Sequence, residues 1–361
     1  MSGGMGKQIL WLREEARTTE RRTPLLPKGA KELIEAGFEV VVEKSEKRII
    51  SNAAYEAAGC TMAEPGAWEN APKDAVILGL KELPKAPEML KHTHIYFAHA
   101  YKEQNGWQAL LTRFLNGHGS LLDIEYMTKN DGKRVVAFGY WAGYMGAALA
   151  LLEWHDKQAG RASYIAKGLS PFESAEALDA LIRQSASGGK TPTALVIGAG
   201  GRSGRGAAEI LERHGVKVTK WGRKETANLD RQAILDHDIL INCAFVAHQI
   251  PPFLTKEHLK GDHRLSVISD VSCDPFSDFN PLPLYGEPTS WAAPAVKVDG
   301  LDLIAIDNLP SLLPTEASME FAGLLLPYLK ALPERTTNDI WRNCDAAFQS
   351  ACDAMVKKKA S

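Results

Sequence analysis

The chain has 361 residues, of which 45% are hydrophobic and 24% charged, and its formal net charge is −2. This length is enough for two domains with substantial cores, and the nearly neutral charge offers no field for nucleic acid or an anionic membrane. The longest apolar run, residues 142–152, is too short to span a bilayer. The first residues lack the apolar segment of a secretory signal.

Five cysteines are present, and none forms a C-x-x-C pair. An odd number of separated thiols suits a reducing cytoplasm, although a disulfide between distant cysteines stays open. We therefore expect a cytoplasmic protein, and the near-neutral charge predicts that it binds neither nucleic acid nor a membrane. We also expect a monomer that acts on small molecules.

Strands and helices alternate through the first 137 residues, which predicts an α/β domain. Residues 75–80, AVILGL, are continuously apolar, as is typical of a strand that a parallel sheet buries on both faces. The charged stretch 13–22, REEARTTERR, is interpreted mainly as a solvated loop. The expected strands are residues 8–12, 40–42, 75–80, 94–98, 120–123 and 134–137, and the expected helices are residues 30–36, 53–58 and 106–115.

A second alternation of strands and helices follows. It begins with an apolar helix over residues 141–157, which we expect to connect the two domains. The remaining expected strands are residues 194–197, 217–221, 239–243, 265–270 and 303–306, and the remaining helices are residues 174–185 and 204–214.

The C-terminal tail predicts two helices, residues 318–332 and 338–357. Such an apolar pair needs a surface to cover, because it is not stable alone. We expect it to cover the first sheet, so that residues 1–137 plus 315–361 form a substrate domain and residues 138–314 a dinucleotide-binding domain. The fold class is α/β, with two Rossmann-like domains, parallel sheets flanked by helices, and a cleft between them.

A glycine-rich turn lies between the expected strand 194–197 and the helix that follows it. Gly198 permits a sharp turn, and Gly200 and Gly201 let backbone N–H groups approach a pyrophosphate at the helix N-terminus. The spacing departs from G-x-G-x-x-G because Ser203 stands where a third glycine is expected. The strand–turn–helix context favours a nucleotide site, with a structural turn as the alternative.

Two titratable residues end neighbouring strands of the first domain. Lys81 follows AVILGL and His99 follows HIYFA, and ligands bind at the carboxyl ends of parallel strands. Partial desolvation brings the pKa of a lysine toward neutrality, which suits a general base. A plain surface charge is the alternative. Lys102 and Gln104 follow closely and can bind an acid group.

Three histidines, His92, His94 and His99, lie along one strand and at its end. No carboxylate ligand accompanies them at a recognisable interval, so we expect no metal.

Six longer segments of the chain have a distinctive sequence. They are ILGLKELP at 77–84, YFAHAYKEQNGW at 96–107, RVVAFGYWAGYMGAALA at 134–150, GRSGRGA at 201–207, INC at 241–243 and IDNLPSLLPTEAS at 306–318. In these segments the chain resembles the saccharopine dehydrogenases of the NAD-dependent, L-lysine-forming type, and more distantly alanine dehydrogenase and transhydrogenase. The resemblance covers nearly the whole chain. It implies an oxidoreductase of lysine biosynthesis by the α-aminoadipate route, which converts saccharopine, NAD⁺ and water to L-lysine, 2-oxoglutarate and NADH.

The resemblance also implies residue roles. Lys81 accepts the proton of the secondary amine, and His99 moves protons during hydrolysis of the imine. Glu20 and Glu125 match acidic neighbours that tune the charge of Lys81. The implied substrate-binding residues are Arg22, Lys81, Lys102, Gln104, Arg134 and Phe138. The implied cofactor-binding residues, with those of the glycine loop, are Gly198, Gly200, Gly201, Arg202, Ser203, Arg223, Thr226, Phe245, Val271, Ile306, Asp307, Asn308 and Leu309.

Two departures from the family pattern stand out. Ser203 replaces a cysteine that pairs in yeast-type members with the one matching Cys243, so that disulfide cannot form here. Gly222-Arg223-Lys224 stands where a carboxylate normally binds the adenosine ribose. NADP is therefore an alternative to NAD, although Glu225 or Asp230 can supply the acid. A related opine-type dehydrogenase and a non-catalytic nucleotide-binding module remain the alternative functions; Lys81 and His99 argue against the second.

Overall fold

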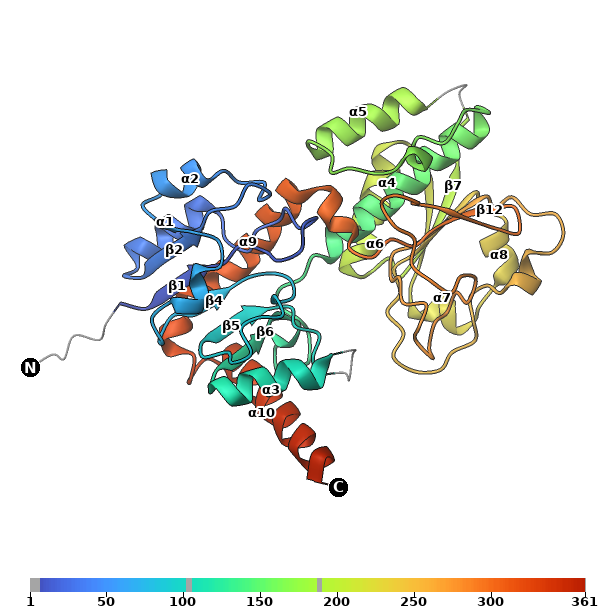
Figure 1. Ribbon diagram of the computed structural model, residues 1–361. Helices are drawn as coiled ribbons and strands as arrows, with labels where there is room; N and C mark the ends of the chain where they lie inside the picture. Colours follow the sequence, from blue (N-terminus) through green and yellow to red (C-terminus); the bar gives the residue numbers. More distant parts are fainter. Residues whose placement is uncertain (1–6, 102–105, 187–189, 361) are drawn as a thin grey trace, which may run out of the picture. The chain divides into compact units, whose positions relative to one another are not determined.

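The computed structural model describes residues 7–101, 106–186 and 190–360. The chain divides into two compact units, one formed by Met1–Ala137 with Ala317–Ser361 and the other by Phe138–Glu316 (Figure 1). In the part of the chain that the structure describes, each unit contains one six-stranded sheet. The prediction of two α/β domains with mainly parallel sheets is confirmed.

The sheet of the first unit has the order β3-β2-β1-β4-β5-β6, and every neighbouring pair is parallel. The residues that follow β1, β4, β5 and β6 therefore all leave the same edge of the sheet. The strands are β1 Ile9–Leu12, β2 Glu39–Glu43, β3 Thr61–Ala63, β4 Val76–Leu78, β5 Thr93–Tyr96 and β6 Ser120–Asp123.

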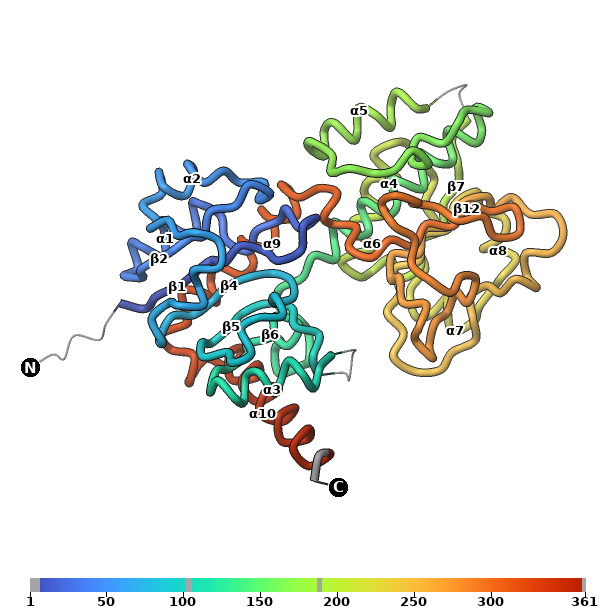
Figure 2. Tube along the Cα trace, viewed as in Figure 1, coloured from blue at the N-terminus to red at the C-terminus, as the bar shows by residue number. Residues whose placement is uncertain are grey.

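Helices from both ends of the chain cover this sheet. Phe114 on α3 and Phe348 on α10 meet edge to face with their ring centroids 5.7 Å apart, and the trace in Figure 2 runs α10 beside α3 and β6. The C-terminal helices thus contribute to the core of the first unit. The helices are α1 Pro27–Glu35, α2 Asn52–Ala57, α3 Trp107–Gly117, α9 Pro314–Lys330, which begins in the second unit, and α10 Asp339–Ala360.

The sheet of the second unit has the order β11-β12-β10-β9-β7-β8. Only the edge strand β11 is antiparallel among the described residues. Asp299 and Gly300, with φ of 45° and 86°, form the two-residue hairpin loop between β11 and β12. The strands are β7 Thr193–Ile197, β8 Lys217–Trp221, β9 Ile239–Asn242, β10 Val267–Asp270, β11 Val296–Val298 and β12 Leu301–Ile304.

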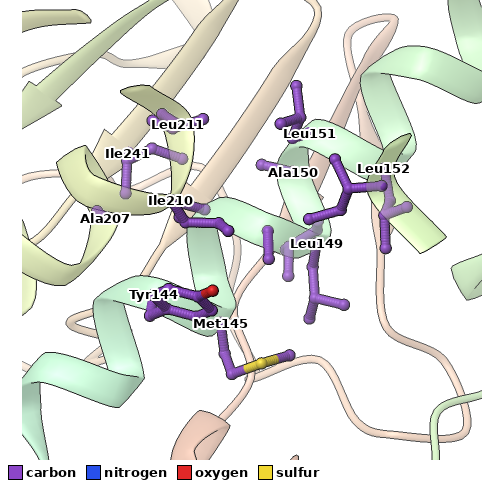
Figure 3. Packing of buried hydrophobic residues seen from close by; sticks show 14 of the residues in the cluster. Tyr144, Met145, Leu149, Ala150, Leu151, Leu152, Ala207, Ile210, Leu211 and Ile241 are labelled. Carbon is purple, nitrogen blue, oxygen red and sulfur yellow. The ribbon is translucent and has the colours of Figure 1, made fainter. Parts of the chain in front are cut away.

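The long apolar helix α4, Gly139–Gln158, contributes many of the buried residues in one of the hydrophobic cores of the second unit (Figure 3). It packs closely on α6, Arg202–Arg213, and glycines at the contact allow this approach. A Cβ on Gly143 would lie 1.7 Å from the Ser203 carbonyl oxygen, and one on Gly206 would lie 2.1 Å from the Tyr140 carbonyl oxygen. The other helices are α5 Ala175–Ser185, α7 Arg223–Ala227 and α8 Arg231–Leu235.

Several expectations about the elements are wrong. Residues 134–137 do not form a strand of the sheet. Instead, Arg134 forms an isolated bridge with Thr128 and Val135 donates its N–H to the Met127 carbonyl oxygen, across the turn at Gly132. The helix α4 lies wholly inside the second unit and is not a connector. Residues 13–22 are not a solvated loop, since none of their charged side chains is exposed. The sequence interpretation missed β3, β11, α7 and α8.

No helix in residues 7–101, 106–186 or 190–360 is both long and apolar enough to cross a membrane.

Candidate active site

The titratable residues predicted at strand ends follow neighbouring strands of the first sheet. Lys81 follows β4, His99 follows β5 and Glu125 follows β6. Since these strands are parallel neighbours, the three residues leave the same sheet edge. The strand before Lys81 ends at Leu78, two residues earlier than the apolar run predicts.

Glu20 and Arg22 form a buried ion pair that reaches Lys81 electrostatically. The Arg22 side chain donates to both Glu20 carboxylate oxygens, at 2.8 and 2.7 Å. Burial acts to raise the pKa of Glu20, but the charge and hydrogen bonds of Arg22, with a smaller contribution from the charge of Lys81, bring it below its usual value. Glu20 is therefore an anion at neutral pH that stabilises positive charge on Lys81.

His99 lies beside an acid in an uncommon backbone conformation. Its Nδ1 is 3.4 Å from Glu125 Oε2, and its ring stacks on Phe97 with centroids 6.2 Å apart. The φ of His99 is +50°, in the left-handed region that non-glycine residues seldom adopt. Such backbone strain is concentrated at functional sites. The side chain is 55% exposed, so it is accessible to water and small molecules.

Asp123, the last residue of β6, holds Glu125 in place. Its Oδ1 accepts the Glu125 backbone N–H at 2.9 Å. Burial, followed by the charge of Glu125, raises the pKa of Asp123 to about 6, against opposing hydrogen bonds and the charge of His99. Sequence reasoning missed Asp123, although its place at the end of an apolar strand next to Glu125 was a usable signal.

The remaining substrate-binding candidates are spread along the chain. Arg134 is exposed beside its bridge to Thr128, and Phe138 is the N-cap residue of α4 in the second unit. Lys102 and Gln104 lie outside the residues that the structure describes.

The glycine loop forms a tight turn between β7 and α6. Gly198 has a φ of 77°, and a Cβ there would lie 2.8 Å from the backbone of Cys243. A Cβ on Gly204 would lie 2.2 Å from the Gly198 carbonyl oxygen. Gly204 therefore provides the close helix–strand packing usually provided by the third glycine, one residue after Ser203. By contrast, a Cβ on Gly200 would meet no atom within 4 Å, so protein packing does not require a glycine there.

The cofactor-binding candidates gather at one edge of the second sheet. They follow β7, β8, β9, β10 and β12, whose mutual pairings are all parallel. Phe245 is 85% exposed on the segment after β9, and Asn308 has a left-handed φ of 72° after β12. A sheet edge of this kind is where dinucleotides bind in doubly wound folds.

A carboxylate is present at the end of β8, although not at the usual position. Glu225 Oε2 accepts the Gly222 N–H at 2.7 Å, and this hydrogen bond lowers the pKa of Glu225. Arg223 and Lys224 are exposed beside it. Asp230 instead caps α8 by accepting the Ala233 N–H at 3.1 Å. Glu225 is thus the better placed of the two predicted acids.

The three histidines considered as metal ligands do not converge. His94 is buried against Trp68 and Phe114, and burial lowers its pKa well below the usual value. His92 Nε2 lies 3.0 Å from the Ala71 carbonyl oxygen, and His99 lies beside Glu125. Within the described ranges, no cluster of three or more His, Cys, Asp or Glu side chains is arranged to hold a metal.

The glycine loop at the carboxyl edge of a parallel sheet places the protein in the class of dinucleotide-binding α/β proteins. Residues 11–145 match the N-terminal domain family of alanine dehydrogenase/PNT, and residues 209–356 match the C-terminal domain family. A solved structure of L-alanine dehydrogenase has a TM-score of 0.70 and covers 96% of this chain and 100% of that chain. At 15% identity this likeness is one of fold.

Curated relatives narrow the class. Saccharopine dehydrogenase [NAD(+), L-lysine-forming] from Yarrowia lipolytica is 41% identical over 94% of this chain and 96% of its own length. The protein of the same name from Emericella nidulans is 41% identical over 95% of this chain and 97% of its own length. The chain belongs to the family of NAD(+)-dependent, L-lysine-forming saccharopine dehydrogenases, which confirms the resemblance found in the sequence.

Proposed function

We propose that the protein is an NAD-dependent saccharopine dehydrogenase that interconverts saccharopine, NAD⁺ and water with L-lysine, 2-oxoglutarate and NADH. The observation that carries the proposal is the full-length relationship, at 41% identity, to enzymes of that name. The opine-type and non-catalytic alternatives gain no support from these relatives. Five unpaired thiols support a reducing, cytoplasmic location.

Residues of the second unit fit a nicotinamide dinucleotide. The open space beside Gly200 allows a pyrophosphate to approach the backbone, and the N-terminus of the twelve-residue helix α6 favours negative charge. A dinucleotide held there would supply the hydride acceptor for the glutarate α-carbon. The residues proposed to hold the dinucleotide are Gly198, Gly200, Gly201, Arg202, Ser203, Arg223, Thr226, Phe245, Val271, Ile306, Asp307, Asn308 and Leu309.

We assign NAD ahead of NADP. The Glu225 carboxylate at the end of β8 can accept hydrogen bonds from ribose hydroxyls and repels a 2′-phosphate. The exposed cations Arg223 and Lys224 instead favour a 2′-phosphate and therefore NADP. If Glu225 decides the choice, Glu225→Gln will narrow the preference for NADH over NADPH, and Asp230→Asn will leave it unchanged.

Lys81 is proposed to take the proton from the secondary amine of saccharopine. Loss of that proton frees the nitrogen lone pair, which assists hydride departure from the adjacent carbon. The Glu20 anion supports the ammonium that Lys81 becomes. This pairing is the local feature that supports a proton-accepting role.

His99 is proposed to manage the protons of imine hydrolysis. If its Nδ1–H faces Glu125, its Nε2 is left to accept a proton from the attacking water. The same nitrogen can return the proton to the departing lysine amine. Lys81 and His99 act in different half-reactions because the protons they accept come from different atoms, the substrate nitrogen and the water oxygen.

Cationic residues are proposed to bind the substrate carboxylates. Arg134 is exposed, whereas Arg22 is only 2% exposed and pairs with Glu20. Arg22 is therefore proposed to share its guanidinium between Glu20 and a substrate carboxylate. Lys102, Gln104 and Phe138 complete the proposed set.

Oxidation of NADH by the protein in the presence of lysine and 2-oxoglutarate tests the proposal, with NADPH in a parallel reaction. Absorbance of the reduced cofactor is followed. No oxidation with lysine, but oxidation with another amine, would overturn the saccharopine assignment. Lys81→Met should lower kcat by about 10²- to 10⁴-fold, while NADH binding, measured by fluorescence, stays near wild type. Lys85→Met, at an exposed position of the same loop, is the matched control.

A further inference from the structure

We propose that Glu15 is a positioning residue that, together with Arg13, fixes the backbone from which Lys81 acts. The inference rests on the proposed function, because it gives Lys81 the proton-accepting role. Both charged residues lie in the segment directly after β1, beside the end of β4.

Glu15 binds the backbone of Lys81 directly. Its Oε1 accepts the Leu80 N–H at 2.7 Å, and its Oε2 accepts the Lys81 N–H at 2.9 Å. A carboxylate that receives two consecutive backbone N–H groups fixes the orientation of the peptide plane between them. Glu15 therefore holds the backbone from which the Lys81 side chain extends.

Arg13 binds the same segment through two backbone carbonyl groups. Its backbone N–H donates to the Leu78 carbonyl oxygen at 3.0 Å, and its Nη2 donates to the Lys81 carbonyl oxygen. The guanidinium lies so close to Gly79 that a Cβ there would be 2.5 Å from Arg13 Nε. The segment from Gly79 to Lys81 thus lies against this arginine.

The two charged side chains also contact each other in the interior. Arg13 Nη1 is 3.4 Å from Glu15 Oε2, and the side chains are 1% and 7% exposed. Burying such a pair is costly unless further hydrogen bonds satisfy it. Three of those further bonds go to Leu80 and Lys81, just after the end of β4 at Leu78. On the β5 side, Gly79 N–H still donates to the Ile95 carbonyl oxygen and the Leu80 carbonyl oxygen accepts the Phe97 N–H. The pair therefore binds the remaining backbone groups of Leu80 and Lys81, where the reactive lysine must be placed.

Displacement of a reacting group by about 1 Å can cost about 10²-fold in rate. Glu15→Gln keeps the side-chain length but leaves one acceptor oxygen for two N–H donors and removes the charge opposite Arg13. We expect a fall in kcat of about 10- to 100-fold, with NADH affinity unchanged. The matched control is Asp156→Asn, because Asp156 is a buried acid that pairs with Arg161 and accepts the Tyr164 N–H at 2.7 Å. It should keep the wild-type kcat.

A double-mutant cycle separates positioning from a general structural effect. Glu15→Gln should have no further effect on residual turnover in the Lys81→Met background, because its effect passes through Lys81. Equal effects in both backgrounds, or a wild-type kcat for Glu15→Gln while Lys81→Met is slow, would overturn this inference alone. A wild-type kcat for Lys81→Met would instead overturn the role proposed for Lys81. If Glu15→Gln does not fold, Arg13→Lys enters the same cycle with the same expected outcomes.

Discussion

Arg22 donates three hydrogen bonds to the carboxylate of Glu20, two from its guanidinium and one from its backbone N–H at 3.0 Å. Arg22 is only 2% exposed and Glu20 only 1%. The charge of Lys81 acts on the same carboxylate. One buried anion therefore supports both the arginine proposed to bind a substrate carboxylate and the lysine proposed to accept the substrate proton.

Replacement of Glu20 should be costly for folding. Glu20→Gln leaves the Arg22 guanidinium buried without its counter-charge, which should lower the free energy of unfolding by about 3 to 5 kcal/mol. Urea denaturation at pH 7 measures the change. Glu64→Gln is the matched control, because it breaks the exposed pair with Lys44 and should leave unfolding near wild type. An equal, small effect of both substitutions would show that the buried pair contributes little.

The effect of Glu20→Gln on the free energy of unfolding should depend on pH, and the direction follows from the pKa of Glu20. Because the folded-state pKa of Glu20 is lowered, its contribution is fully present above the unfolded-state pKa of about 4.3. It is lost as the pH falls through the still lower folded-state pKa. The stability gap between wild type and Glu20→Gln should therefore be constant near neutrality and narrow below a pH of about 4.

Two glycines of the nucleotide loop should respond differently to alanine. Gly204→Ala places a Cβ 2.2 Å from the Gly198 carbonyl oxygen and must separate α6 from β7, so both thermal stability and NADH affinity should fall. Gly200→Ala meets no protein atom. It should keep the wild-type melting temperature and weaken only NADH binding, because the added methyl group occupies the path of the pyrophosphate. Thermal melts and NADH fluorescence titrations check both; unchanged NADH affinity in Gly200→Ala would remove the pyrophosphate from that position.

Local patterns in the sequence were enough to predict most of the architecture. Apolar runs such as residues 75–80 and 239–243 predicted buried parallel strands, and the glycine turn with its helix predicted the nucleotide edge. The hairpin of β11 and β12 was missed although Asp299-Gly300 is a strong turn signal, because the exposed strand before it has only three residues. Residues 134–137 have the apolar composition of a strand but are not one. Their backbone pairs instead with the nearby residues Met127 and Thr128.

The charged segment 13–22 shows what local patterns cannot predict. Seven charged residues in ten predict solvent exposure, yet Arg13 and Glu15 are buried because their partners lie at Leu80 and Lys81, more than sixty positions away. Sequence-distant backbone groups of this kind carry no sequence signal. The position of Lys81 and His99 after neighbouring strands was predictable from the sequence, but the contacts that hold the Lys81 backbone were not.

Gly79→Ala probes the contact between Arg13 and the Lys81 segment from the other side. A Cβ at this position would lie 2.5 to 2.6 Å from the Arg13 guanidinium, so the arginine must move and its bond to the Lys81 carbonyl is strained. We expect kcat to fall by about 10-fold, as for a sub-ångström displacement of Lys81, together with a lower melting temperature. Gly323→Ala is the control, because this glycine is exposed in α9 with open space around it. It should be neutral or stabilise by about 0.5 to 1 kcal/mol; a wild-type kcat in Gly79→Ala would show that Arg13 can yield without moving Lys81.

Asp123 should make stability fall as the pH rises from about 4 to about 6, the opposite of Glu20. Its carboxyl is buried, and within the described part of the chain its Oδ2 has no hydrogen-bond partner. Its folded-state pKa of about 6 lies above the unfolded value of about 3.9, so between these values the folded state holds a proton that the unfolded state has lost. Ionisation of Asp123 should therefore cost about 2 to 3 kcal/mol of stability across this range.

Asp123→Asn isolates that contribution. Asparagine keeps an oxygen to accept the Glu125 N–H but cannot ionise. Wild type should lose stability relative to Asp123→Asn as the pH rises from 4.5 to 7.5, which urea unfolding at a series of pH values measures. A difference that stays constant over this range would show that Asp123 does not titrate there. Asp131→Asn, at an exposed turn, is the matched control and should give no such trend.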